Sequence, residues 1–337
     1  MAKVKTFKTI FPAVSVPLND DYSINEPEFR AYLRWIKTFY GKGMDGLVCN
    51  GHTGEITGLT RAERKRVVEI CAEECGDVMT IISGVNCENT AESIEMAKEA
   101  KEAGADGILL MPPHMWLRFG MNPDAPFEYV KDVAEGADID IIIHLYPATS
   151  KAFYPVETLI KMCKEIDHVK CIKMGTRVTS IYEHDVRLLR QECPDISLIT
   201  CHDETLCVSW FPGMDGALIG FAGCVPEIIC PAREVFANPD KHTLKEAQDW
   251  SDRIYHISQA IYGGGQPSGE AHARLKEALK QRGIFSSALM RKPVLPLNQE
   301  EKDWVALGLE RSQLPEVDMT QFEDCLLYTS PSPRDRQ

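Results

Sequence analysis

Short apolar segments alternate with amphipathic segments from residue 10 to residue 236. The apolar segments are rich in Ile, Val and Leu, and polar residues do not alternate within them. This pattern is typical of strands in a parallel sheet that helices cover. Eight strands are predicted, at 10–16, 46–50, 79–84, 107–111, 139–145, 169–173, 196–200 and 217–220.

The segments between these strands carry helix signals. Thr60 and Glu63 form a capping box, and Pro155 suits the first turn of a helix. Eight strands alternating with helices predict an α/β fold, the (β/α)8 TIM barrel. The main alternative is an open doubly wound sheet, which usually has a GxGxxG turn after its first strand, and this sequence has none there. The predicted helices are 61–74, 91–103, 126–135, 155–165, 179–192, 204–211 and 227–236.

Only helical patterns follow residue 240, at 244–262, 270–282 and 300–312. We therefore predict a barrel at 1–239 and a helical C-terminal extension at 240–325 that packs on it. Residues 326–337 read LLYTSPSPRDRQ, which is aperiodic and rich in Ser, Pro and Arg. We interpret them as a non-native tail, with a native disordered tail as the alternative.

Composition narrows the function classes. The 337 residues are 44% hydrophobic and 26% charged, as in a soluble globular protein. A net charge of -13 argues against nucleic acid and gives no support for an anionic membrane surface. The 12 cysteines include no CxxC pair. The sequence also shows no secretory signal and no segment apolar enough to span a membrane. We expect a cytoplasmic protein without nucleic-acid, membrane or metal partners.

Lys173 closes the apolar run 169–173 and precedes the turn Met174-Gly175. Active sites of such barrels lie at the C-terminal ends of the strands. Burial disfavours an ammonium group, lowers its pKa and leaves a neutral amine that can form a Schiff base with a carbonyl carbon. A lysine at a strand end can equally reach solvent, so the other strand ends decide between the two interpretations.

Two of those ends carry candidate residues. The turn 51–55, GHTGE, follows the second strand. Its backbone N–H groups can form an anion-binding concavity for the carboxylate of a 2-oxo acid, and Thr53 adds a hydroxyl. After the fifth strand, His144 and Tyr146 share a face, and either could transfer protons. The alternatives are an ordinary loop and side chains that only pack.

The order and spacing of these motifs resemble the dihydrodipicolinate synthase/N-acetylneuraminate lyase family across most of residues 7–300. The resemblance implies a class I lyase with Lys173 as its Schiff-base lysine and no metal or organic cofactor. It also implies a small 2-oxo acid as substrate and a homo-oligomer, commonly a homotetramer. The glycine-rich segment 216–220 resembles the eighth strand of the family. The predicted substrate-binding residues are Gly51, His52, Thr53, Gly54, Ile219 and Gly220.

Departures from the family pattern limit the assignment. The family usually has Thr or Ser where His52 stands, and a tyrosine where alignment on Pro147 places His144. We predict that Tyr146 supplies the catalytic hydroxyl, with His144 as its rival and Thr53 assisting. True synthases carry an arginine two residues after that proline, where this chain has Thr149. The segment 113–116, PHMW, replaces a tyrosine pair and predicts a larger, more apolar pocket.

The sequence therefore predicts a lyase that performs aldol cleavage or condensation, or dehydration, on a 2-oxo (deoxy sugar) acid. One alternative is a non-catalytic 2-oxo acid-binding barrel, and another is a true 4-hydroxy-tetrahydrodipicolinate synthase. A third is a metal-dependent lyase that uses His202, Asp203 and Glu204. Adjacent side chains diverge, which disfavours the metal site, and helix capping explains Asp203 better.

Overall fold

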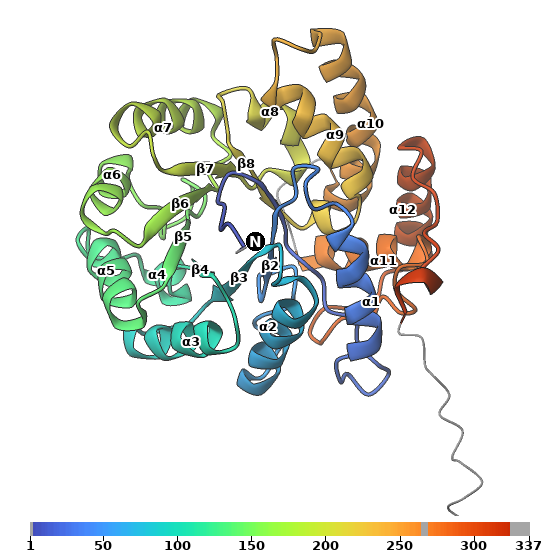
Figure 1. Ribbon diagram of the computed structural model, residues 1–337, viewed down its shortest axis with the longest axis horizontal. Helices are drawn as coiled ribbons and strands as arrows, with labels where there is room; N and C mark the ends of the chain where they lie inside the picture. Colours follow the sequence, from blue (N-terminus) through green and yellow to red (C-terminus); the bar gives the residue numbers. More distant parts are fainter. Residues whose placement is uncertain (1–2, 264–268, 324–337) are drawn as a thin grey trace, which may run out of the picture.

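The computed structural model describes residues 3–263 and 269–323, and the predicted tail at 326–337 lies outside them. All eight strands pair in parallel, in the order β1-β8-β7-β6-β5-β4-β3-β2. The N–H of Val14 donates to the carbonyl of Val48 at 2.9 Å and closes the sheet between β1 and β2. The predicted barrel is confirmed (Figure 1). Its strands are β1 (Ile10–Pro12), β2 (Gly46–Cys49), β3 (Thr80–Val85), β4 (Gly107–Leu110), β5 (Asp140–His144), β6 (Val169–Met174), β7 (Ser197–Thr200) and β8 (Gly216–Ile219).

Helices surround the sheet, and the Thr60–Glu63 capping box is present at the start of α2. No range was predicted for α1, which Asn25 caps, or for the short α4, none of whose residues is buried. The predicted helix 204–211 is divided into a 3-10 turn and α8. The helices of the barrel are α1 (Glu26–Lys37), α2 (Arg61–Cys75), α3 (Thr90–Glu102), α4 (His114–Phe119), α5 (Ala125–Ala137), α6 (Val156–Glu165), α7 (Thr179–Glu192), η1 (Asp203–Thr205), α8 (Leu206–Trp210), η2 (Phe221–Gly223) and α9 (Pro226–Ala237).

The C-terminal extension consists of α10 (Leu244–Tyr262), α11 (Gly269–Gln281), α12 (Gln299–Arg311) and the turn η3 (Thr320–Phe322). Figure 1 shows these helices grouped on one side of the barrel, next to α9 and α1. Within the described residues, no helix is long and apolar enough to cross a membrane.

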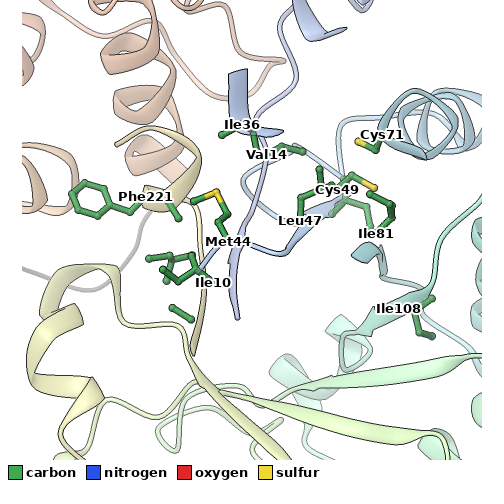
Figure 2. Close-up of a cluster of buried hydrophobic side chains, with 14 of the residues drawn as sticks. Ile10, Val14, Ile36, Met44, Leu47, Cys49, Cys71, Ile81, Ile108 and Phe221 are labelled. Carbon is green, nitrogen blue, oxygen red and sulfur yellow. The ribbon is translucent and has the colours of Figure 1, made fainter. Parts of the chain in front are cut away.

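The apolar core has two layers because side chains alternate along each strand. One layer fills the barrel interior and includes Phe11, Val48 and Ile82. The other lies between the sheet and the helices, and Figure 2 shows part of it. It includes Ile10, Leu47 and Ile81, each of which directly precedes one of the three interior residues in the sequence. The residues that fill the interior therefore identify which side chains of each strand point inward.

Candidate active site

The inward face of the strands continues past the interior core to the C-terminal mouth of the barrel. Ile142, Cys171, Ile199 and Leu218 belong to the interior layer. Two residues further along the same strands stand His144, Lys173, Cys201 and Gly220, which alternation places on the inward face. Lys173 is paired in register with His144 on β5 and with Ile199 on β7.

Lys173 is half-buried, and the structure gives its amine no hydrogen-bond or ion-pair partner among the described residues. Burial lowers the pKa of Lys173, and the positive charge of Arg177 lowers it further, while Cys201 and Asp203 oppose both effects. A lysine in this position has an increased fraction of neutral amine, the form that attacks a carbonyl carbon.

A cavity of about 400 Å³ opens above Lys173. Of the predicted site residues, it brings together Gly51, His52, Thr53, His144, Tyr146, Lys173 and Gly220. Two predicted residues do not line it. Ile219 packs in the outer core and its carbonyl accepts a hydrogen bond from Ala13 at 2.9 Å, while Leu218 faces the cavity. Gly54 passes so close to the backbone that an added Cβ would lie 3.0 Å from the carbonyl oxygen of Val14.

The turn after β2 is held by its own backbone. The N–H of Glu55 donates to His52 at 3.0 Å, and the N–H of Ile56 donates to Gly51 at 3.2 Å. Thr53 is buried, and its hydroxyl lies against Gly220, where an added Cβ would be only 2.8 Å away. Gly220 is therefore required at the end of β8 for the Thr53 hydroxyl to face the cavity.

Imidazole rings form one wall of the cavity. The ring centroid of His52 lies 6.3 Å from that of His114 and 5.8 Å from that of His144. Burial lowers the pKa of His52 to about 3 and that of His144 well below its ordinary value, and Lys173 contributes to both shifts. Both rings are consequently neutral near neutral pH. They can each donate and accept a hydrogen bond.

Tyr146 lies against this wall. Its hydroxyl is 3.5 Å from Nε2 of His52, and its ring meets the ring of His144 edge-on at 5.0 Å. Burial raises the pKa of Tyr146, so the phenol keeps its proton near neutral pH. Both rivals for proton transfer thus reach the same cavity.

The segment 113–116, at the start of α4, contributes to the cavity wall. His114 and Leu117 line the cavity, whereas the Trp116 ring packs against Tyr129 and Tyr154 at 5.7 and 6.2 Å. This part of the wall therefore carries one imidazole and one aliphatic side chain.

Further polar residues of the cavity were not predicted as site residues or were given another role. Arg177 follows β6 and pairs with Glu204. Asp203 has a pKa of about 6, raised by burial. Tyr262 and His272 come from α10 and α11, and burial lowers the pKa of His272 to about 4. Tyr262 and His272 could not be predicted from the ends of the strands, because they lie on helices of the extension.

The three residues considered for a metal site have different partners. The His202 ring packs on Tyr182 at 4.7 Å, and Glu204 pairs with Arg177. Asp203 accepts the N–H of Phe221 at 2.9 Å, so it caps the turn η2 and not its own helix, which corrects our interpretation. Within the described ranges, no group of three His, Cys, Asp or Glu residues is placed to hold a metal ion.

A parallel barrel with a lysine at the end of β6, in one cavity with the tight turn after β2, has the architecture of the class I lyases. The chain belongs to the Dihydrodipicolinate synthetase family, whose model matches residues 6–311. At the level of the family, the protein is a lyase that uses a Schiff base with pyruvate.

Two relatives illustrate the similarity. The 4-hydroxy-tetrahydrodipicolinate synthase of Bartonella bacilliformis is 26% identical over 309 residues, which cover 91% of this chain and 98% of that protein. An uncharacterized DapA-like lyase of Thermofilum pendens is 25% identical, over 86% of this chain and 92% of the relative.

Solved structures confirm the fold. YagE, a prophage protein of the dihydrodipicolinic acid synthase family from E. coli K12, was solved in complex with pyruvate. It has a TM-score of 0.81 and 20% identity, covering 91% of this chain and 99% of YagE. The dihydrodipicolinate synthase of Aquifex aeolicus has a TM-score of 0.80 and 19% identity, covering 93% and 100% of the two chains.

Proposed function

We propose that Lys173 forms the Schiff base with pyruvate or a longer 2-oxo acid, and that the protein cleaves or forms a C–C bond or removes water from a 2-oxo (deoxy sugar) acid. The observation that carries the proposal is the amine of Lys173, which has no partner among the described residues and lies in one cavity with Thr53 of the turn and the hydroxyl of Tyr146. The electrophile is built on a side chain of the protein, so the chemistry requires no metal or organic cofactor.

The geometry supports a sequence of steps. The backbone N–H groups of the turn and the Thr53 hydroxyl hold the substrate carboxylate, and the amine of Lys173 attacks C2. Loss of water gives an iminium, which accepts the electron pair of the adjacent C–C or C–H bond. Cleavage of the C–C bond releases an aldehyde, whereas loss of the C3 proton gives an enamine that can expel the C4 hydroxyl as water. Tyr146 donates and accepts the proton in either route, and water then hydrolyses the product iminium to free the 2-oxo acid and the amine of Lys173.

The cavity lining favours a hydroxylated substrate over one with a second carboxylate. Among the described residues that line the cavity, Arg177 alone carries a guanidinium group. This group already binds Glu204 and the carbonyl of Gly175. The neutral imidazoles of His52 and His144 can instead pair with hydroxyl groups. A true 4-hydroxy-tetrahydrodipicolinate synthase, the activity named for the Bartonella relative, is the second candidate.

Other properties of the protein follow from this proposal and from the family. The small 2-oxo acid is the partner that the cavity suits, and we propose a homo-oligomer in the cytoplasm. A non-catalytic sensor is disfavoured because the cavity retains two groups able to transfer a proton, Tyr146 and His144.

A substrate panel tests the function. We expect turnover of a 2-keto-3-deoxy sugar acid, measured as release of pyruvate for cleavage or as appearance of a dehydrated 2-oxo acid for elimination. Condensation of pyruvate with aspartate semialdehyde, at a higher kcat/KM than any sugar acid, would instead identify a true synthase. Adduct formation with pyruvate and borohydride, combined with no turnover in the whole panel, would support the sensor.

Thr53→Val is expected to lower kcat/KM because it removes the hydroxyl that faces the substrate carboxylate. Losing one hydrogen bond to a charged group costs about 1.5–3 kcal/mol, roughly a tenfold effect or more. Steady-state kinetics with the substrate found in the panel measure the change. Thr179→Val, at the exposed start of α7, is the control. Equal kinetics for the two variants would show that Thr53 does not hold the substrate.

A further inference from the structure

A buried ion pair joins the anion-binding turn to the C-terminal extension. The Lys276 amine on α11 lies 2.5 Å from Oε1 of Glu55, and the two side chains are 1% and 8% exposed. Lys276 also donates to the carbonyl of Leu289 at 2.8 Å. The second carboxylate oxygen of Glu55 accepts the backbone N–H of Arg291 at 2.8 Å. Glu55 therefore binds two separate segments of the extension.

The backbone conformation at position 55 favours glycine, so the glutamate there is explained by the interactions of its side chain. Its φ of 58° lies in the left-handed region, where glycine is the residue without steric cost. Glu55 is also two residues after Thr53, inside the hydrogen-bonded turn. Holding the carboxylate of Glu55 consequently holds the part of the turn that presents the Thr53 hydroxyl.

The same helix face also reaches the cavity. His272 lies one turn before Lys276, so both side chains are on one side of α11. His272 lines the cavity, and Leu275 lies so close to Gly220 that an added Cβ would be 3.0 Å from it. Through these contacts α11 touches the turn after β2, the end of β8 and the open cavity together.

We propose that Glu55 and Lys276 are a positioning pair through which α11 sets the affinity of the site for the 2-oxo acid. This inference rests on the proposed function, because it assumes that the turn holds the substrate carboxylate. Neither residue touches the reacting atoms. Their effect is to fix the turn, and with it Thr53, in the geometry that binds the carboxylate.

Glu55→Gln is the main test, because it keeps the side-chain shape and removes the charge. We expect the KM for the 2-oxo acid substrate to rise about tenfold or more, the scale of one lost charged hydrogen bond. We expect kcat to change little, since Lys173 and Tyr146 are untouched. The matched control is Glu227→Gln. Glu227 pairs with Arg282 at 2.6 Å and also ties the extension to the barrel, but away from the turn.

The double variant Glu55→Gln/Lys276→Met separates positioning from general stability. Breaking one partner leaves a buried unpaired charge, and removing both relieves that cost. We expect the melting temperature to recover in the double variant while the KM stays high. Recovery of both quantities would reduce the pair to a structural role and overturn the inference. Lys276→Arg keeps the ion pair and should retain a KM near that of the wild type.

Hydrogen exchange of the backbone amides at 51–58 in the substrate-free protein gives a readout that does not depend on activity. Exchange should accelerate in Glu55→Gln and stay as in the wild type in Glu227→Gln. Equal exchange in all three proteins, or an equal KM in the two variants, would overturn the inference. Absence of any adduct with pyruvate in the wild type would contradict the proposed function instead, and the exchange result would still decide whether the pair positions the turn.

Discussion

Lys173→Ala is expected to abolish trapping of pyruvate by borohydride and to lower kcat by about 10⁴-fold or more, the scale at which the loss of a nucleophile is felt. The wild-type adduct should map to Lys173 by peptide mass. The reason is the position of this amine, which lies at the base of the cavity without a partner among the described residues. Its lowered pKa increases the neutral fraction that reacts.

The same substitution should leave the fold intact. Alanine removes an amine that makes no hydrogen bond or ion pair in the part of the chain that the structure describes, so its loss leaves no other group unsatisfied. The control is Lys170→Ala on the same strand, because Lys170 is exposed. An adduct on Lys170 or Lys151, or a Lys173→Ala protein that fails to fold, would contradict the proposed role.

Adduct formation should also depend on pH in one direction. The pKa of Lys173 lies below its ordinary value of 10.5, because burial disfavours the ammonium form. The amine therefore loses its proton at a lower pH than an exposed lysine, and trapping should rise with pH through that lowered pKa. The buried His52, with a pKa near 3, does not titrate in the same range.

Much of the site could be predicted because it depends on strand geometry. A strand alternates its side chains, and the catalytic end of a barrel is known, so Lys173 and His144 could be placed from the sequence. Thr53 followed from its position in the turn directly after the second strand. The alternation of side chains also explains why Ile219, a predicted site residue, does not line the cavity. Ile219 and Leu218 are neighbours on β8, and a shift of one residue moves a side chain from the cavity to the outer core.

The remaining residues depend on contacts that no local pattern reports. His272 and Tyr262 reach the cavity from the extension, and helical periodicity shows only that one face of each helix is buried. It does not show what that face touches. His114 lines the cavity from the start of the short helix α4, for which no range was predicted.

Two side chains compete for the role of proton relay. Tyr146 and His144 lie on one face of the chain at the C-terminal end of β5, and both line the cavity above Lys173. Burial shifts their pKa values in opposite directions. The phenol keeps its proton and can both donate and accept. Nδ1 of His144 is buried without a hydrogen-bond partner among the described residues, so nothing there stabilises an imidazolium ion and the ring is a poorer proton acceptor.

Tyr146→Phe is expected to lower kcat by about 10²–10⁴-fold, the usual contribution of general acid–base catalysis, while pyruvate trapping by borohydride persists. Single-turnover kinetics and adduct mass measure the two steps separately. His144→Asn and His144→Gln serve as the comparison and should have a smaller effect. His52 is 3.5 Å from the Tyr146 hydroxyl, so His52→Gln should lower kcat moderately by changing the orientation of that hydroxyl. If the His144 variants lose turnover and Tyr146→Phe keeps it, the relay is the imidazole that alignment on Pro147 places at the position of the family tyrosine.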